Sequence, residues 1–107
     1  MADDSLPRHF QELKRDYPAV LAALEELGRS TRGAGPIAAK QAHLIQLAAS
    51  AAIQSEGAVH SHTRRALEAG ASPAEVRHAV LLLVSTIGFP RTAAALSWTD
   101  DILNRRD

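Results

Sequence analysis

The segment PIAAKQAHLIQLAASAAIQ, residues 36–54, carries a single formally charged side chain, Lys40. Its alanines and leucines are strong helix formers, and its apolar residues recur on nearly every side of a helix drawn through it. A helix of this kind is normally buried in the core of a domain. We therefore expect residues 36–54 to form the central buried helix of the fold, and its many alanines to let neighbouring helices approach closely.

The rest of the chain also has the pattern of short helices. Upstream, apolar stripes predict one helix that ends before Pro18 and a second that ends in the loop at residues 32–36. Downstream, a helix is expected from Glu56 to Gly70, where glycine suits the left-handed position after a helix C-terminus. No stretch alternates polar and β-branched residues as a strand would. The predicted fold class is therefore all-α.

The clearest helix start in the sequence is SPAE, residues 72–75. It combines an N-cap serine, a proline in the first turn and a glutamate three residues after the serine, which is the pattern of a capping box. An apolar stripe predicts that this helix continues to Ile87 and that the residues GFP, 88–90, end it. A last helix follows them, which gives about six helices in all.

Length and charge limit the class of protein. The chain has 107 residues, so we expect a single domain over residues 1–107. Lys and Arg total 12 and Asp and Glu total 12, which gives a net charge of +0, and aromatic residues make up 4%. Such a chain lacks the positive field and the stacking platforms of a nucleic-acid-binding protein. We expect no nucleic-acid partner, and a helix-turn-helix interpretation of residues 64–83 is disfavoured for the same reason.

The absence of cysteine and of an apolar leader segment restricts the chemistry and the cellular location that we expect. The sequence has no cysteine, which excludes disulfides, iron–sulfur clusters, zinc–thiolate sites and thiol nucleophiles. Residues 1–5, MADDS, are acidic and polar, unlike a signal peptide, and the uncharged apolar stretch at residues 79–90 is shorter than the roughly 20 residues that span a bilayer. We expect a cytoplasmic protein with no targeting segment and no membrane contact.

Two histidines lie close together in the segment SEGAVHSH, residues 55–62. On a helix, Ser55, Ala58 and His62 share one face. His60 lies on a different face, where we expect it to be exposed or turned to a neighbouring chain.

A third histidine, His43, is the polar exception in the apolar segment 36–54. It shares a helical stripe with Leu47, Ser50 and Gln54, so it needs a hydrogen-bond partner if it is buried. The ordinary interpretation of each of these histidines is a surface residue or a hydrogen-bonded core residue.

Two sharper interpretations of these residues are disfavoured. A metal site made from the three histidines and Glu56 would require His60 and His62 to share one ion, but residues two apart on a helix diverge. A nucleophile and base formed by Ser55 and His62 would lie two turns apart, about 10 Å along the helix axis. We therefore expect no metal and no cofactor.

Four segments of the sequence carry a resemblance to a known family. They are LIQLA at 44–48, HTRRAL at 62–67, AGASPAEV at 69–76, and GFP at 88–90 with the alanine-rich stretch after it. In order and spacing they resemble the carboxymuconolactone decarboxylase and alkylhydroperoxidase-D-like superfamily. The resemblance implies that family's helical fold, with residues 1–35 as N-terminal lead-in helices and 36–107 as core helices. It also implies a homo-oligomer, a trimer or hexamer, which agrees with a small chain that cannot cover its own central helix.

The resemblance also assigns roles to residues. Relatives of the peroxidase type use a Cys-x-x-Cys pair, a histidine four residues after the second cysteine, and a glutamate on the preceding helix. In this chain the two cysteine positions fall on Ser55 and Ala58, the lost thiol positions. The family histidine matches His62, and His43 occupies the glutamate position. Thiol peroxidase chemistry is thereby excluded.

The decarboxylase branch of the family lacks the cysteine pair and carries a His-x-Arg element similar to residues 62–64. By this resemblance, Arg64 would hold the carboxylate of a small carboxylated lactone, and His62 with His43 would supply the general acid or base. Two imidazoles in place of a carboxylate and an imidazole would titrate near neutral pH and make ligand affinity depend on pH.

Three functions stay open at the level of sequence. The first is a non-thiol lyase or decarboxylase with His62, His43 and Arg64 as catalytic residues around a small-molecule pocket. The second is a catalytically inactive relative of the alkylhydroperoxidase-D branch that serves as a ligand-binding or oligomeric scaffold protein. The third is an unrelated helical interaction module. Imidazoles of His43 and His62 that converge favour the first, and imidazoles packed only against leucine, alanine and backbone favour the second.

Overall fold

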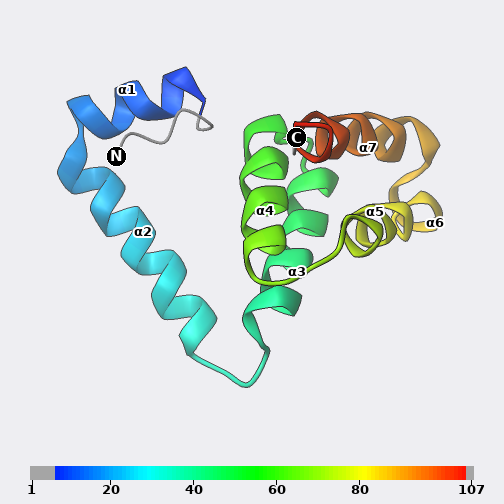
Figure 1. Ribbon diagram of the computed structural model, residues 1–107, viewed down its shortest axis with the longest axis horizontal. Coiled ribbons are helices and arrows are strands. Elements are labelled where there is room, and N and C mark those ends of the chain that lie inside the picture. Colours follow the sequence, from blue (N-terminus) through cyan, green and yellow to red (C-terminus); the bar gives the residue numbers. More distant parts are fainter. Residues whose placement is uncertain (1–6, 106–107) are drawn as a thin grey trace. The chain divides into compact units, whose positions relative to one another are not determined.

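The computed structural model describes residues 7–105, and every regular element in that range is an α-helix (Figure 1). This confirms the all-α fold class. The helices are α1 (Arg8–Asp16), α2 (Pro18–Gly33), α3 (Ala39–Ala52), α4 (Glu56–Glu68), α5 (Pro73–Leu81), α6 (Val84–Ile87) and α7 (Phe89–Leu103). In this part of the chain, none of them has both the length and the apolar character needed to cross a membrane.

The chain divides into two compact units, one that ends at Pro36 and one that begins at Ile37. The first unit holds α1 and α2, which are separated at Pro18 because a proline suits the first turn of a new helix. The sequence places the change from lead-in helices to core helices between residues 35 and 36. The interpretation of the whole chain as a single domain stays a prediction.

The second unit packs α3, α4, α5 and α7 around one hydrophobic core. Its buried members are Leu47, Ala51, Val59, Ala66, Ala71, Val76, Val80, Ala95 and Leu103. Alanines are frequent among them, so helix backbones come close together, and interiors packed at this density leave little freedom for neighbouring side chains. Burying one leucine or valine side chain contributes about 1.5–3 kcal/mol, so this cluster fixes the helices that carry the candidate site.

Helix α3 differs from its prediction. Only one of its faces is buried, and this face carries His43, Leu47, Ser50 and Ala51. Elsewhere on the helix and just after its end, Ile45 and Ile53 are 55% and 76% exposed. A single chain therefore leaves the other faces of α3 uncovered, as expected for a chain too short to cover its own central helix, and the helix is shorter than the predicted residues 36–54.

The junction between α4 and α5 follows its sequence signals. Gly70 has φ +103°, and the Ala71 N–H donates to the Ala66 carbonyl at 2.9 Å, which closes α4 in a Schellman motif. The Glu75 N–H donates to the Ser72 hydroxyl at 3.0 Å, and the Ser72 N–H donates to the Glu75 carboxylate at 2.9 Å. The predicted capping box is confirmed.

The break between α5 and α7 lies elsewhere than predicted. The helix that begins at Pro73 ends at Leu81, and the four-residue helix α6 comes before Gly88. Gly88, with φ +93°, is the N-cap of α7, and Phe89 and Pro90 form the first turn of that helix. The predicted stop is therefore also the start of the next helix, because proline lacks the N–H that a first helical turn leaves unbonded.

The capping box makes a contribution to stability that can be tested by pH. The pKa of Glu75 lies below its ordinary value of 4.5 because the Ser72 N–H and then the Lys40 ammonium hydrogen-bond to its carboxylate. A lowered pKa stabilises the fold above the ordinary value, and this contribution is lost as the pH falls through the lowered one. Glu75→Gln should therefore lower the urea midpoint at neutral pH, and the deficit should shrink in acid.

Urea unfolding followed by circular dichroism measures both midpoints. Glu68→Gln is the matched control, since Glu68 is an exposed carboxylate at the end of α4 and takes no part in the capping box. A deficit of equal size at neutral and acidic pH would contradict a role for the Glu75 charge.

Candidate functional site

The imidazoles of His43 and His62 meet where α3 packs against α4. Their Nδ1 atoms lie 3.4 Å apart, and the ring centroids lie 5.6 Å apart with the planes tilted by 37°. His43 is 7% exposed and stands on the buried face of α3. His62 is half-buried on α4. Two helices thus hold two titratable rings against each other in a mostly apolar setting.

This geometry favours one proton between the two rings. A neutral imidazole carries one N–H and one acceptor nitrogen, so a facing pair of Nδ1 atoms can be bridged only when one donates and the other accepts. Two imidazolium ions at this distance would repel each other, which disfavours double protonation. The pair can therefore hold a proton at a defined place and pass it on, which is what general acid–base chemistry requires.

Arg64 lies on another face of α4. It follows His62 by two residues, which corresponds to about 200° around the helix. Its side chain is half-buried, and its Nη1 atom is buried. Of the three predicted site residues, the structure brings His43 and His62 together and sets the backbone of Arg64 apart from them.

Two buried oxygen atoms lie on the same pair of helices. Gln46 Oε1 and Thr63 Oγ1 have no hydrogen-bond partner within residues 7–105. Gln46 follows His43 by about one turn of α3, and Thr63 is the residue after His62 on α4. Buried polar atoms are nearly always bonded to protein or to ordered water, so each of these two is suited to a buried water molecule. Sequence reasoning missed both, because helical periodicity does not tell a buried amide from an exposed one.

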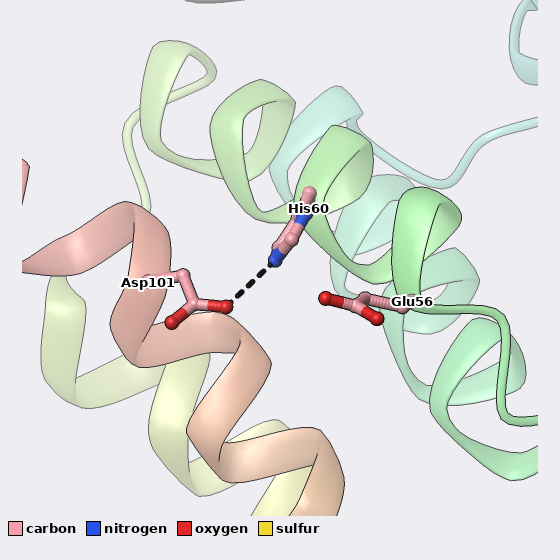
Figure 2. Close-up of side chains that lie close together, drawn as sticks. All are labelled: Glu56, His60 and Asp101. Carbon is pink, nitrogen blue, oxygen red and sulfur yellow. Dashed lines mark hydrogen bonds and ion pairs between the residues drawn. The ribbon is translucent and has the colours of Figure 1, made fainter. Parts of the chain in front are cut away.

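His60 has a different partner from the one expected. Its Nε2 atom lies 3.0 Å from Oδ2 of Asp101 on α7, and its side chain is 15% exposed (Figure 2). Glu56, one turn earlier on α4, points toward the same place. Of the two expectations for His60, a fully exposed side chain is wrong for the single chain, and a contact with a neighbouring chain stays a prediction. The only sequence signal was the i, i+4 spacing of Glu56 and His60, and Asp101 is too far along the chain for that signal to reveal.

Comparison with known proteins identifies the family. A family model described as the carboxymuconolactone decarboxylase family matches residues 18–101. The chain belongs to the carboxymuconolactone decarboxylase family. No curated protein and no solved structure gives a match. The match covers α2 through most of α7 and includes both histidines of the pair, so the resemblance found in the sequence is confirmed.

This member of the carboxymuconolactone decarboxylase family has no cysteine at any position. Ser55 is the N-cap of α4, and Ala58 lies in the first turn of that helix. A helix N-terminus stabilises a thiolate, which is why this place suits a redox thiol. The assignment of Ser55 and Ala58 as lost thiol positions comes from the resemblance and stays a prediction.

The close contact of the two imidazoles predicts coupled titration. In the wild-type protein the ring signals of His43 and His62 should change together in two separated steps, because the first proton is shared and the second is repelled. In His62→Gln, His43 should titrate in one step. Proton NMR of the ring carbons over the neutral pH range measures both curves.

His78→Gln is the control for this titration. It removes an exposed imidazole from α5 and should leave the curves of His43 and His62 unchanged. A His43 curve that is identical in the wild type and in His62→Gln would show that the two rings do not share a proton.

Proposed function

We propose that this protein is a non-thiol lyase or decarboxylase that acts on a small carboxylated or lactone metabolite, with His43 and His62 as its acid–base pair. The observation that carries the proposal is the 3.4 Å separation of their Nδ1 atoms. An isolated buried histidine needs only a backbone carbonyl as a partner, whereas two facing imidazoles from two helices form a place where one proton is held and exchanged.

The chemistry of the proposed reaction matches this pair. When a carboxylate leaves as CO₂, the electrons of the broken C–C bond pass into the neighbouring unsaturated system, and a proton must then be added at carbon. A protonated imidazole supplies that proton to carbon and is left neutral, and its partner ring can pass it a new proton from water before the next turnover. The second ring therefore does the work that a carboxylate does in relatives with a Glu–His pair.

Arg64 is proposed to hold the substrate carboxylate. Guanidinium groups bind carboxylates through two parallel hydrogen bonds, and the long arginine side chain reaches beyond the face on which its Cα lies. This role comes from the His-x-Arg resemblance, and it requires the side chain to turn toward the imidazole pair when substrate binds. The buried oxygen atoms Gln46 Oε1 and Thr63 Oγ1 would accept hydrogen bonds from substrate hydroxyl groups or from water.

A cytoplasmic location of the protein stays a prediction.

A second candidate function is an oligomeric scaffold without turnover. The observation that favours it is the large amount of exposed apolar surface in the second unit. Side chains that are more than half exposed include Ile45, Ile53, Leu81, Leu82 and Phe89. Monomeric proteins rarely leave many large apolar side chains in water, and association covers them. Such faces support the homo-oligomer, a trimer or hexamer, in either function.

A measurement of catalytic turnover distinguishes the proposed lyase from a scaffold without activity. The wild-type protein should consume a small carboxylated γ-lactone such as carboxymuconolactone, followed by the loss of its ultraviolet absorbance and by release of CO₂. His43→Gln and His62→Gln should each lower kcat/KM by about 10² to 10⁴, the usual contribution of a general acid or base. Arg64→Gln should mainly raise KM. His78→Gln, which alters an exposed imidazole, should change neither constant.

A wild-type protein that is folded and assembled but inactive on a panel of carboxylated lactones would contradict the lyase and favour the scaffold. Equal activity in the wild type and His62→Gln would contradict the acid–base role.

The expected homo-oligomer is tested separately, by measuring the mass of the assembly in solution. Light scattering coupled to size-exclusion chromatography should give a mass three or six times that of the chain. Ile45→Glu and Ile53→Glu should lower that mass, because each places a charge in an apolar contact. Ala74→Glu, at an exposed position in the first turn of α5, is the control. A wild-type monomer would contradict the assembly.

A further inference from the structure

Three metal-ligating side chains converge on the side of α4 that faces α7 (Figure 2). Glu56 and His60 lie one turn apart on α4, and Asp101 comes from the last part of α7. One ligand atom from each residue lies within 4.8 Å of the other two. His60 Nε2 and Asp101 Oδ2 are 3.0 Å apart. The cluster thus joins two helices through one imidazole nitrogen and two carboxylates.

These separations fit a metal ion. Zinc binds nitrogen and oxygen ligands at about 2.0–2.2 Å, so neighbouring ligand atoms around one ion stand about 3–3.5 Å apart. His60 Nε2 and Asp101 Oδ2 already have this separation. A Glu56 carboxylate oxygen lies within 4.8 Å of both of these atoms, on an exposed and flexible side chain.

The helices that carry the ligands are held in place. The His60 side chain is 15% exposed, and Val59 beside it is fully buried. Ile102, the neighbour of Asp101 on α7, is 5% exposed. Asp100, the residue before Asp101, is ion-paired at 3.1 Å with Arg77 of α5. Ligands on rigid helices are set before the ion arrives, and this favours binding.

The third residue of the cluster is informative because the contact between His60 and Asp101 does not use it. A hydrogen bond from a neutral His60 to Asp101 employs two of the three groups and leaves both carboxylates without a balancing positive charge. The Glu56 carboxylate, directed at the same place, makes no hydrogen bond or ion pair in the described part of the chain. Two carboxylates that lie this close repel unless positive charge stands between them. A divalent cation balances both charges and gives Glu56 a partner.

We propose that Glu56, His60 and Asp101 bind one divalent transition-metal ion of the zinc type, which bridges α4 and α7. A mixed set of one imidazole and two carboxylates suits such an ion, whereas Mg²⁺ and Ca²⁺ take oxygen ligands and softer ions prefer sulfur. Water fills the remaining positions, because both carboxylates are exposed. Sequence reasoning found no metal site because it considered only a site in which His60 and His62 bind the same ion. Asp101, which lies 41 residues after His60, was not considered as a ligand.

The test uses the full chain, stripped of metal by a chelator and titrated with zinc chloride in a calorimeter. We expect one zinc ion per chain in the wild type and no measurable binding in Glu56→Gln or Asp101→Asn, which keep shape but remove a ligand charge. In Glu56→Gln the removed charge is exposed and lies in the first turn of α4, so the metal-free melting temperature of this variant is measured as its own reference. Zinc should raise the melting temperature of the wild type and leave that of both variants unchanged, because an ion that binds the folded state stabilises it.

Two control variants locate the ion. Glu68→Gln removes an exposed carboxylate at the far end of α4, and His62→Gln removes the imidazole that meets α3; both should bind zinc as the wild type does. The proposal is overturned if the wild type binds no zinc, if binding survives both Glu56→Gln and Asp101→Asn, or if only His62→Gln loses it. None of these results bears on the lyase assay, which depends on His43 and His62.

Discussion

The packing of α3 against α4 is the constraint on which the other features of the second unit depend. Leu47 and Ala51 of α3 and Val59 of α4 have no exposed surface. Alanine at such a contact brings the two helix backbones close, and a core packed at this density does not let one helix slide along the other. His43 lies one turn before Leu47, and His62 follows Val59 by three residues. The same packing that stabilises the core therefore sets the distance between the two imidazoles.

This arrangement holds two imidazoles together in a chain that has no thiol. The assignment of Ser55 and Ala58, at the start of α4, as lost thiol positions stays a prediction. Proton transfer needs only two nitrogen atoms at a fixed separation, and the packing of α3 on α4 gives His43 and His62 such a separation. A fold of this kind positions side chains, and the chemistry follows from which side chains occupy the positions.

Sequence reasoning succeeded where the deciding forces are local. The capping box at Ser72 and Glu75 and the left-handed Gly70 depend on residues within one turn, and a single sequence contains all of that information. The buried stripe that contains His43 is almost as local, because 3.6 residues per turn fixes which side chains share a face. These signals were enough to predict most of the helices and the face on which His43 lies, but not the break after Leu81.

The errors arose where the deciding partner is distant or external. Composition showed that α3 is apolar on several sides, yet it could not show how many neighbours the chain provides, so Ile45 is exposed. Helical spacing showed that His60 and His62 diverge, but the partner of His60 is Asp101 on another helix. A proline can follow the end of one helix or lie in the first turn of the next. The sequence pattern around Pro90 does not distinguish these two positions, and the structure places Pro90 in the first turn of α7. Tertiary contacts decide each of these cases.

Helix α4 therefore contacts α3 with one face and α7 with another. His62 meets α3 and His60 meets α7, and residues two apart on a helix point about 200° away from each other. The spacing that prevents these histidines from sharing one ion also keeps their charges apart, because the buried body of α4 lies between them. A cation held on the α7 side would balance Glu56 and Asp101 without reaching His43 and His62 on the α3 side, which we propose as an acid–base pair. One helix can thus carry an electrostatic bridge and an acid–base pair whose protonation states are set independently.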